Sequence, residues 1–101
     1  MEVNVRKVDV TVRTVSLTKA LLKQVREFKS VPLEPFRTKL DEHQRWTFNA
    51  EYTVGWFRGT VLGYEYEDCV LLAKDGDLYI SRVVRSNLRQ VLPEGCKQIY
   101  V

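Results

Sequence analysis

The fold of this chain is decided by residues 69–84, which read CVLLAKDGDLYISRVV. Two apolar runs flank a polar centre, and at that centre stands the pair Asp75-Gly76. An Asp-Gly pair between apolar runs is a strong β-hairpin signal, because both central residues of a type I′ turn need a positive φ. The sequence therefore predicts a hairpin with strands over 69–73 and 78–84.

Both faces of this hairpin are predicted to be apolar, because residues opposite each other across the turn share a face. The first face carries Ala73, Leu78, Leu71 and Ile80, and the second carries Leu72, Tyr79 and Val70. A single four-turn helix covers only one face of a sheet. We therefore expect the second face to be covered by the segment 33–45, by curvature of the sheet into a half-barrel, or by another molecule.

Upstream of the hairpin, the sequence predicts a strand over residues 3–15 followed by the main helix. β-Branched residues nearly alternate in this strand, and a bulge accommodates the parity slip at Arg6-Lys7. Ser16 or Thr18 can cap the helix. The apolar stripe of the helix is Leu17, Leu21, Val25 and Phe28. Val31-Pro32 ends it, because proline disfavours helical geometry in the residue before it.

The segment 33–45 permits either a short helix or an irregular crossing, and apolar residues at even positions then predict a strand over 46–56. Glycines 55, 59 and 63 predict a bend into a further strand. A short helical turn between Ser86 and Pro93 and an edge strand over 97–101 complete the chain. We expect a single α+β domain, 1–101, with a mostly antiparallel sheet of about five to six strands and one main helix after the first strand.

The composition narrows the class of protein. The chain has 101 residues, of which 45% are hydrophobic, and it contains 5 glycines and 3 prolines. These values exclude disordered and fibrous chains and suit one domain with an ordinary core. The sequence contains neither a secretory signal pattern nor an apolar run near the ~20 residues of a membrane span. A cytoplasmic protein with Cys69 and Cys96 as reduced thiols is the expectation.

Charge is distributed unevenly along the chain. Residues 1–30 carry a net charge of +4 and 81–101 carry +3, whereas 61–80 carry −4. An acidic hairpin between basic ends favours oriented docking onto a mixed-charge partner. The predicted partner-binding residues are the acids Glu65, Glu67 and Asp68, with Tyr64, Tyr66 and Tyr79 as aromatic anchors. The leading hypothesis is a non-enzymatic protein that occludes a protein partner, with a nucleoprotein complex as one candidate.

Two alternatives remain open at this point. Direct nucleic-acid binding would use the basic residues Arg82, Arg85, Arg89 and Lys97. A homodimer would instead close the second apolar face. An enzyme is not expected, because one histidine, His43, and scattered hydroxyls supply no set of nucleophile, base and oxyanion donors. The spacing of the cysteines and the histidine does not suit a metal, and no cofactor motif is present.

Parts of the chain resemble short proteins carried by phages and other mobile elements. The resemblance rests on the opening strand with the segment SLTKALLKQ at 16–24, on Gly59-Thr60-Val61, and on LAKDGDLY at 72–79. Similar small proteins inhibit bacterial defence machinery, including CRISPR-type complexes, by binding to it. The resemblance thus implies a stoichiometric inhibitor, and it transfers no functional residue.

Overall fold

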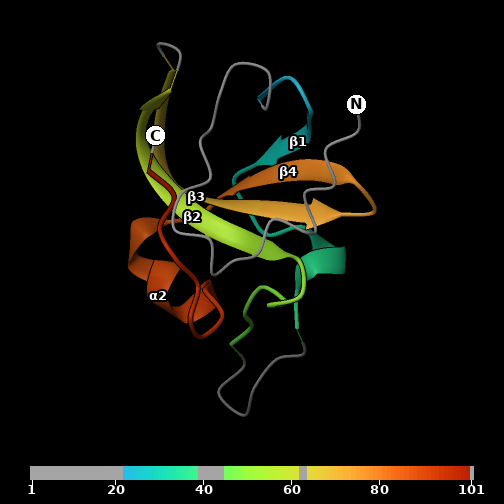
Figure 1. The fold of residues 1–101 in the computed structure, drawn as a ribbon. Helices are drawn as coiled ribbons and strands as arrows, with labels where there is room; N and C mark the ends of the chain where they lie inside the picture. The colour runs from blue at the N-terminus through green and yellow to red at the C-terminus, as the bar shows by residue number, and fades with distance from the viewer. Residues whose placement is uncertain (1–21, 39–44, 62–63, 101) are drawn as a thin grey trace.

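The computed structural model describes residues 22–38, 45–61 and 64–100, which build one four-stranded sheet (Figure 1). Its strands are β1 (Val25–Lys29), β2 (Thr53–Val61), β3 (Tyr64–Lys74) and β4 (Asp77–Arg82). Their order across the sheet is β1-β4-β3-β2. Strands β2, β3 and β4 pair antiparallel, whereas β1 pairs parallel with β4.

The predicted hairpin is confirmed as β3 and β4. Its register pairs Ala73 with Leu78, Leu72 with Tyr79, Leu71 with Ile80 and Val70 with Ser81. The turn residues Asp75 and Gly76 have φ angles of 53° and 85°. Both central positions thus adopt the positive φ that a type I′ turn requires.

The two apolar faces of the hairpin belong to two separate core clusters, as the alternation predicts. The first cluster is Val54, Phe57, Cys69, Leu71, Ala73, Leu78, Ile80 and Ile99. The second cluster is Leu33, Phe36, Phe48, Val70, Leu72, Val83, Leu88 and Val91, with Tyr79 and Trp46 packed against it. The hairpin is therefore buried on both sides.

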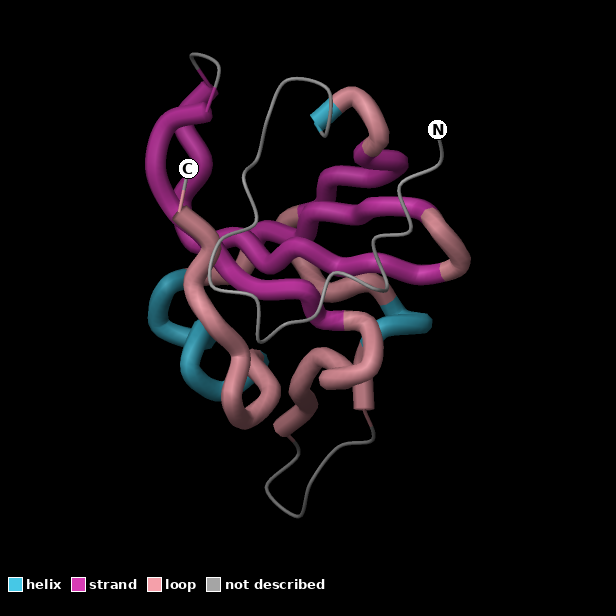
Figure 2. The backbone as a smooth tube through the Cα atoms, in the orientation of Figure 1, coloured by secondary structure: helices cyan, strands magenta, loops and turns pink. Residues whose placement is uncertain are grey.

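The chain itself covers the second face, so no other molecule is needed there. The covering pieces are the 3-10 turn η2 (Glu34–Phe36), residues 46–48, the 3-10 turn η3 (Arg85–Asn87) and helix α2 (Leu88–Val91) (Figure 2). Backbone hydrogen bonds join them: Phe48 donates its N–H to the Val91 carbonyl at 2.8 Å, and Asn49 donates to the Phe36 carbonyl at 2.6 Å. Of the three predicted ways to cover this face, coverage by the segment 33–45 is observed in part, through Leu33 and Phe36.

The predicted fold class is wrong in its helix and in its strand number. Val25–Lys29, assigned to the second half of the main helix, is the edge strand β1. Within the described part of the chain the sheet has four strands rather than five to six, and the one short α-helix, α2, follows the strands. Parallel pairing with β4 overrides the helical spacing of Val25 and Phe28, because a local pattern carries no information on distant backbone partners. The predicted strand 3–15 and the start of the helix lie outside the described residues.

The predicted strand over 46–56 begins later, at Thr53. The carbonyl oxygen of Asn49 accepts hydrogen bonds from the backbone N–H groups of Tyr52 and Thr53 at 3.0 and 3.1 Å, and the Asn49 side chain accepts one from Glu51 N–H at 2.9 Å. This Asx-type turn interrupts the alternation. A register shift between Thr53 and Gly55 then sends Val54 to the first cluster.

The C-terminal elements agree in part with the prediction. The helical turn between Ser86 and Pro93 is observed as η3 and α2. In place of the predicted edge strand over 97–101, the described residues form an isolated parallel bridge between Gln98 and Trp56. Gly59, predicted to lie at a bend, has a φ of 127° at a register shift in β2.

Candidate functional site

The predicted acidic site divides between the two faces of the sheet. Glu65 and Glu67 are exposed and line a hollow of about 300 Å³ together with Arg82 of β4. Arg82 also lies over the ring of Phe28, with 4.4 Å between its guanidinium carbon and the ring centroid. Asp68, the next residue along β3, points to the opposite face and is only 1% exposed.

The aromatic anchors do not form one exposed group with these acids. Tyr79 is half-buried, and its ring lies 5.0 Å from that of Phe36 in the second cluster. The backbone of Tyr64 and Tyr66 lies in β3, opposite Val61 and Gly59. The side chains of Tyr64 and Tyr66 lie outside the described part of the chain.

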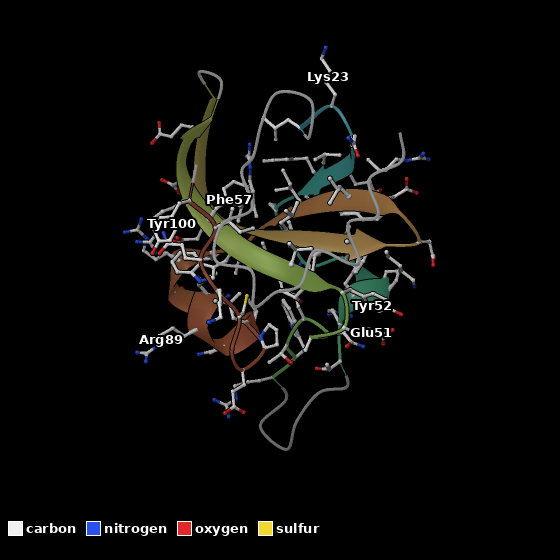
Figure 3. The ribbon with its side chains drawn as sticks, in the orientation of Figure 1. Lys23, Glu51, Tyr52, Phe57, Arg89 and Tyr100 are labelled. Atoms are coloured by element: carbon white, nitrogen blue, oxygen red, sulfur yellow. The ribbon has the colours of Figure 1, made fainter. Side chains whose placement is uncertain are left out.

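The four predicted basic residues also lie apart. Arg82 pairs across the sheet with Cys69, on the side of the first cluster. Arg85 reaches Asp68 on the other side of the sheet. Arg89 projects from α2 into solvent (Figure 3), and Lys97 is exposed next to the edge strand β2, where its carbonyl accepts a hydrogen bond from Trp56 N–H at 3.1 Å.

The structure reveals a groove that the sequence analysis missed. It has a volume of about 310 Å³ and lies beside the second cluster, where the chain leaves β1 and β4. Its lining includes Val31, Pro32, Arg37, Trp46, Val84 and Val91. A second hollow of about 120 Å³ shares Trp46 and Val91 with it and adds Arg45. The two hollows together form the feature that we call the valine groove.

Exposed apolar side chains form the rim of the valine groove. Val31 is 60% exposed and Val84 is 62% exposed. The hydroxyl of Ser81 on β4 donates a hydrogen bond to the Val31 carbonyl at 2.9 Å, which fixes the segment that carries Val31 against the sheet. One signal in the sequence was available: Val83 and Val84 are adjacent on an extended chain, so one of them faces outward when the other is buried.

Arginines supply the charge of the valine groove. Arg37 lies over the ring of Trp46 at 5.7 Å and forms an ion pair with Glu34. Trp46 is held edge-on by Phe48, with ring centroids 5.3 Å apart. Among the described residues that line the two hollows, the charged ones are Arg37 and Arg45. The groove therefore presents an apolar floor beside two arginines, of which Arg37 is already paired with Glu34.

The cysteines are poor nucleophiles in this environment. Burial raises the pKa of Cys69 to about 12, with Arg82 opposing the rise and Asp68 and Glu67 adding to it. Burial likewise raises the pKa of Cys96 to about 11. Both thiols are thus protonated at neutral pH, whereas a thiolate is the reactive form.

No protein-family model, curated protein or solved structure matches the chain. Where the structure describes the chain, it contains no group of three or more His, Cys, Asp or Glu residues placed to hold a metal ion. None of the helices in that same part has the length and apolar character needed to cross a membrane.

Proposed function

We propose that this protein is a non-enzymatic binding protein that occludes a protein partner, and that the partner docks on the valine groove. The observation that carries the proposal is the pair of exposed valines, Val31 and Val84, beside a half-buried tryptophan. An apolar hollow next to an aromatic side chain is the usual setting of an interface hot spot.

The charge of the groove specifies the chemistry of the partner. Arg45 and the Glu34-paired Arg37 line it, so a segment with a bulky apolar side chain and an acidic residue beside it complements the groove. A standard interface covers about 800 Å² per partner. The accessible surface of this chain is 6664 Å², so such an interface needs about one eighth of it.

The second face of the sheet was predicted to need a cover, and the chain itself provides it. That face therefore gives no reason to expect a partner. We therefore place the docking surface at the valine groove and not at the hairpin acids Glu65 and Glu67. The sequence resemblance to short phage proteins extends the proposal to the identity of the partner, which would be a bacterial nucleoprotein or CRISPR-type defence complex.

The test compares two surfaces of one protein. Affinity capture from a bacterial lysate, with and without nuclease, uses wild type, the groove variant Val31→Glu/Val84→Glu, and the hairpin variant Glu65→Lys/Glu67→Lys. We expect a nuclease-resistant partner that the groove variant loses and the hairpin variant retains. Retention by the groove variant contradicts this docking site, and loss on nuclease treatment favours nucleic acid.

A second copy of the chain is the other possible occupant of the groove. Sedimentation velocity distinguishes it, because a homodimer shows a mass that rises with protein concentration. We expect a monomer at all concentrations. A dimer that the Val31→Glu/Val84→Glu variant dissociates contradicts an external partner at this groove.

A further inference from the structure

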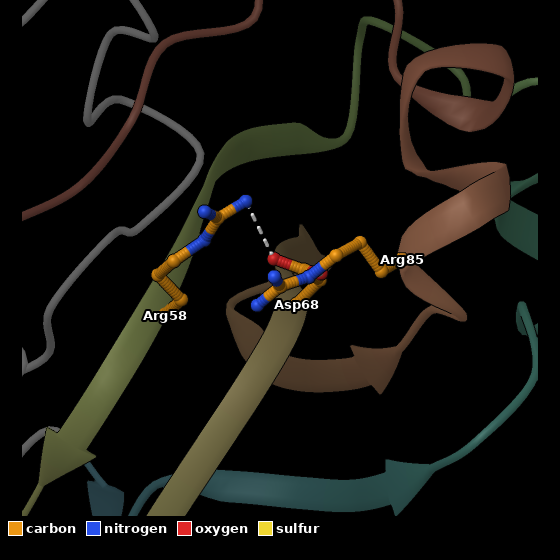
Figure 4. A network of polar contacts seen from close by, with 3 residues as sticks. All are labelled: Arg58, Asp68 and Arg85. Atoms are coloured by element: carbon orange, nitrogen blue, oxygen red, sulfur yellow. Dashed lines mark hydrogen bonds and ion pairs between the residues drawn. The ribbon is translucent and has the colours of Figure 1, made fainter.

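A buried carboxylate brings together two arginines that are far apart in the sequence. Arg58 Nη2 of β2 lies 2.9 Å from Asp68 Oδ1, and Arg85 Nε of η3 lies 3.0 Å from Asp68 Oδ2 (Figure 4). Asp68 is 1% exposed, whereas the side chains of Arg58 and Arg85 are 44% and 71% exposed. One anion therefore lies beneath two accessible cations, and the cluster carries a net charge of +1.

Most hydrogen-bond donors of the two guanidinium groups are not used by Asp68. A guanidinium has five N–H donors. Arg85 donates its Nε–H to Asp68 Oδ2. This hydrogen bond does not use the two Nη groups of Arg85. Asp68 Oδ1 forms an ion pair with Arg58 but accepts no hydrogen bond from a described group.

The two side chains are also held in place before any ligand arrives. The guanidinium carbon of Arg58 lies 5.0 Å from the centroid of the Trp56 ring, and the Arg85 side chain is fixed by its hydrogen bond to Asp68. Fixing a guanidinium lowers the entropic cost of using its remaining donors. By contrast, Arg37 is paired with the exposed acid Glu34, three residues earlier in the chain.

We propose that the Arg58–Asp68–Arg85 cluster binds a phosphate group, with Arg58 and Arg85 donating hydrogen bonds to its oxygens. A planar guanidinium group can donate two parallel hydrogen bonds to two oxygens of a phosphate. Such charge-assisted hydrogen bonds are about twice as strong as neutral ones. Asp68 positions the two arginines and does not touch the ligand. Arg58 and Arg85 do not line the valine groove, although Arg85 follows its rim residue Val84, and this site goes beyond the proposed function.

Inorganic phosphate is the first probe. Titrated at constant ionic strength into the ¹⁵N-labelled full chain, it is expected to shift the Nε–Hε resonances of Arg58 and Arg85 along a one-site curve. Arg85→Gln, at a mostly exposed position, is expected to weaken binding about tenfold or more. Arg26→Gln on β1, at the other edge of the sheet, is the matched control and leaves the affinity unchanged. Unshifted arginine resonances overturn the proposal.

A 12-nucleotide oligothymidylate identifies the source of the phosphate. If a nucleic-acid backbone supplies it, Arg85→Gln weakens oligonucleotide binding and lowers the slope of log K against log salt by roughly 0.7. If only inorganic phosphate responds to the substitution, the ligand is a free phosphate. If Arg85→Gln binds both probes as tightly as wild type, the cluster is a structural tether only and the proposal fails.

Discussion

Gly55 and Ile99 pack so closely that no side chain fits between them. A β-carbon on Gly55 would lie 2.7 Å from Cγ1 of Ile99 and 2.8 Å from the carbonyl oxygen of Lys97. The absence of a side chain lets the C-terminal segment lie against β2, where Ile99 donates its N–H to the Trp56 carbonyl at 2.7 Å. Gly55 thus allows the C-terminal segment to close the first cluster.

Gly55→Ala is therefore expected to lower the free energy of unfolding by about 3 kcal/mol, the upper end of the range for overpacked cores, because a backbone oxygen as well as a side chain must move. Urea unfolding measures it. Ile99→Ala alone should cost about 2–5 kcal/mol. The double variant should cost less than the sum, since truncating Ile99 relieves part of the clash. A Gly55→Ala protein as stable as wild type contradicts this packing.

Replacing the buried carboxylate is expected to destabilise the protein. Asp68→Asn removes the charge that holds Arg58 and Arg85. Hydrogen bonds to charged groups contribute about 1.5–3 kcal/mol each, and we expect a loss in that range because the two arginines remain hydrated. Glu67→Gln, at the exposed neighbouring position, should change stability by less than about 0.5 kcal/mol. Equal effects of the two substitutions in chemical denaturation would count against a stabilising role for the cluster.

The hairpin turn offers a test of backbone strain without steric clash. Gly76 has a φ of 85°, and a β-carbon there would meet no atom within 4 Å. Gly76→Ala is expected to cost about 1 kcal/mol, because an L-residue disfavours this conformation. Gly76→Asn should cost less, since asparagine tolerates the left-handed region better. The Tm of Gly76→Ala should be about 4–8 °C below that of wild type. A larger decrease in Tm for Gly76→Asn than for Gly76→Ala would contradict the assigned turn.

Alkaline pH is expected to destabilise the protein through Cys69. Its pKa is about 12 in the fold and 9.0 without the surrounding structure. Between these values the unfolded thiol loses its proton while the folded thiol keeps it, so stability falls as pH rises from about 9 to 12. The slope is about 1.4 kcal/mol per pH unit once the unfolded thiol is ionised.

Cys69→Ala serves as the comparison for this effect. The variant should show a shallower decline of unfolding free energy above pH 9, although it is less stable at pH 7 because it leaves a small cavity. Cys96, whose pKa rises to about 11, contributes to both proteins and cancels in the difference. Parallel pH profiles for wild type and Cys69→Ala would rule out the proposed contribution of this thiol.

The β3–β4 hairpin could be predicted because its information is local. Asp75-Gly76 fixes the turn, the turn fixes the register, and the register decides which side chains share a face. The membership of Leu71, Ile80 and their neighbours in one cluster, and of Leu72 and Tyr79 in the other, follows from this alone. The short helix before Pro93 was predictable for the same reason.

The edge strand β1 and the sites could not be predicted in this way. Val25 and Phe28 have helical spacing, and only pairing with Leu78 and Ile80, more than fifty residues later, makes them a strand. Arg58, Asp68 and Arg85 likewise meet only because β2, β3 and η3 are neighbours in space. By itself the sequence determined the turn, the alternation and the two-sided core, which depend on contacts across a few residues. Only the tertiary structure decided the coverage of the second face, the valine groove and the arginine pair, because the free energy of these contacts comes from segments that the chain brings together on folding.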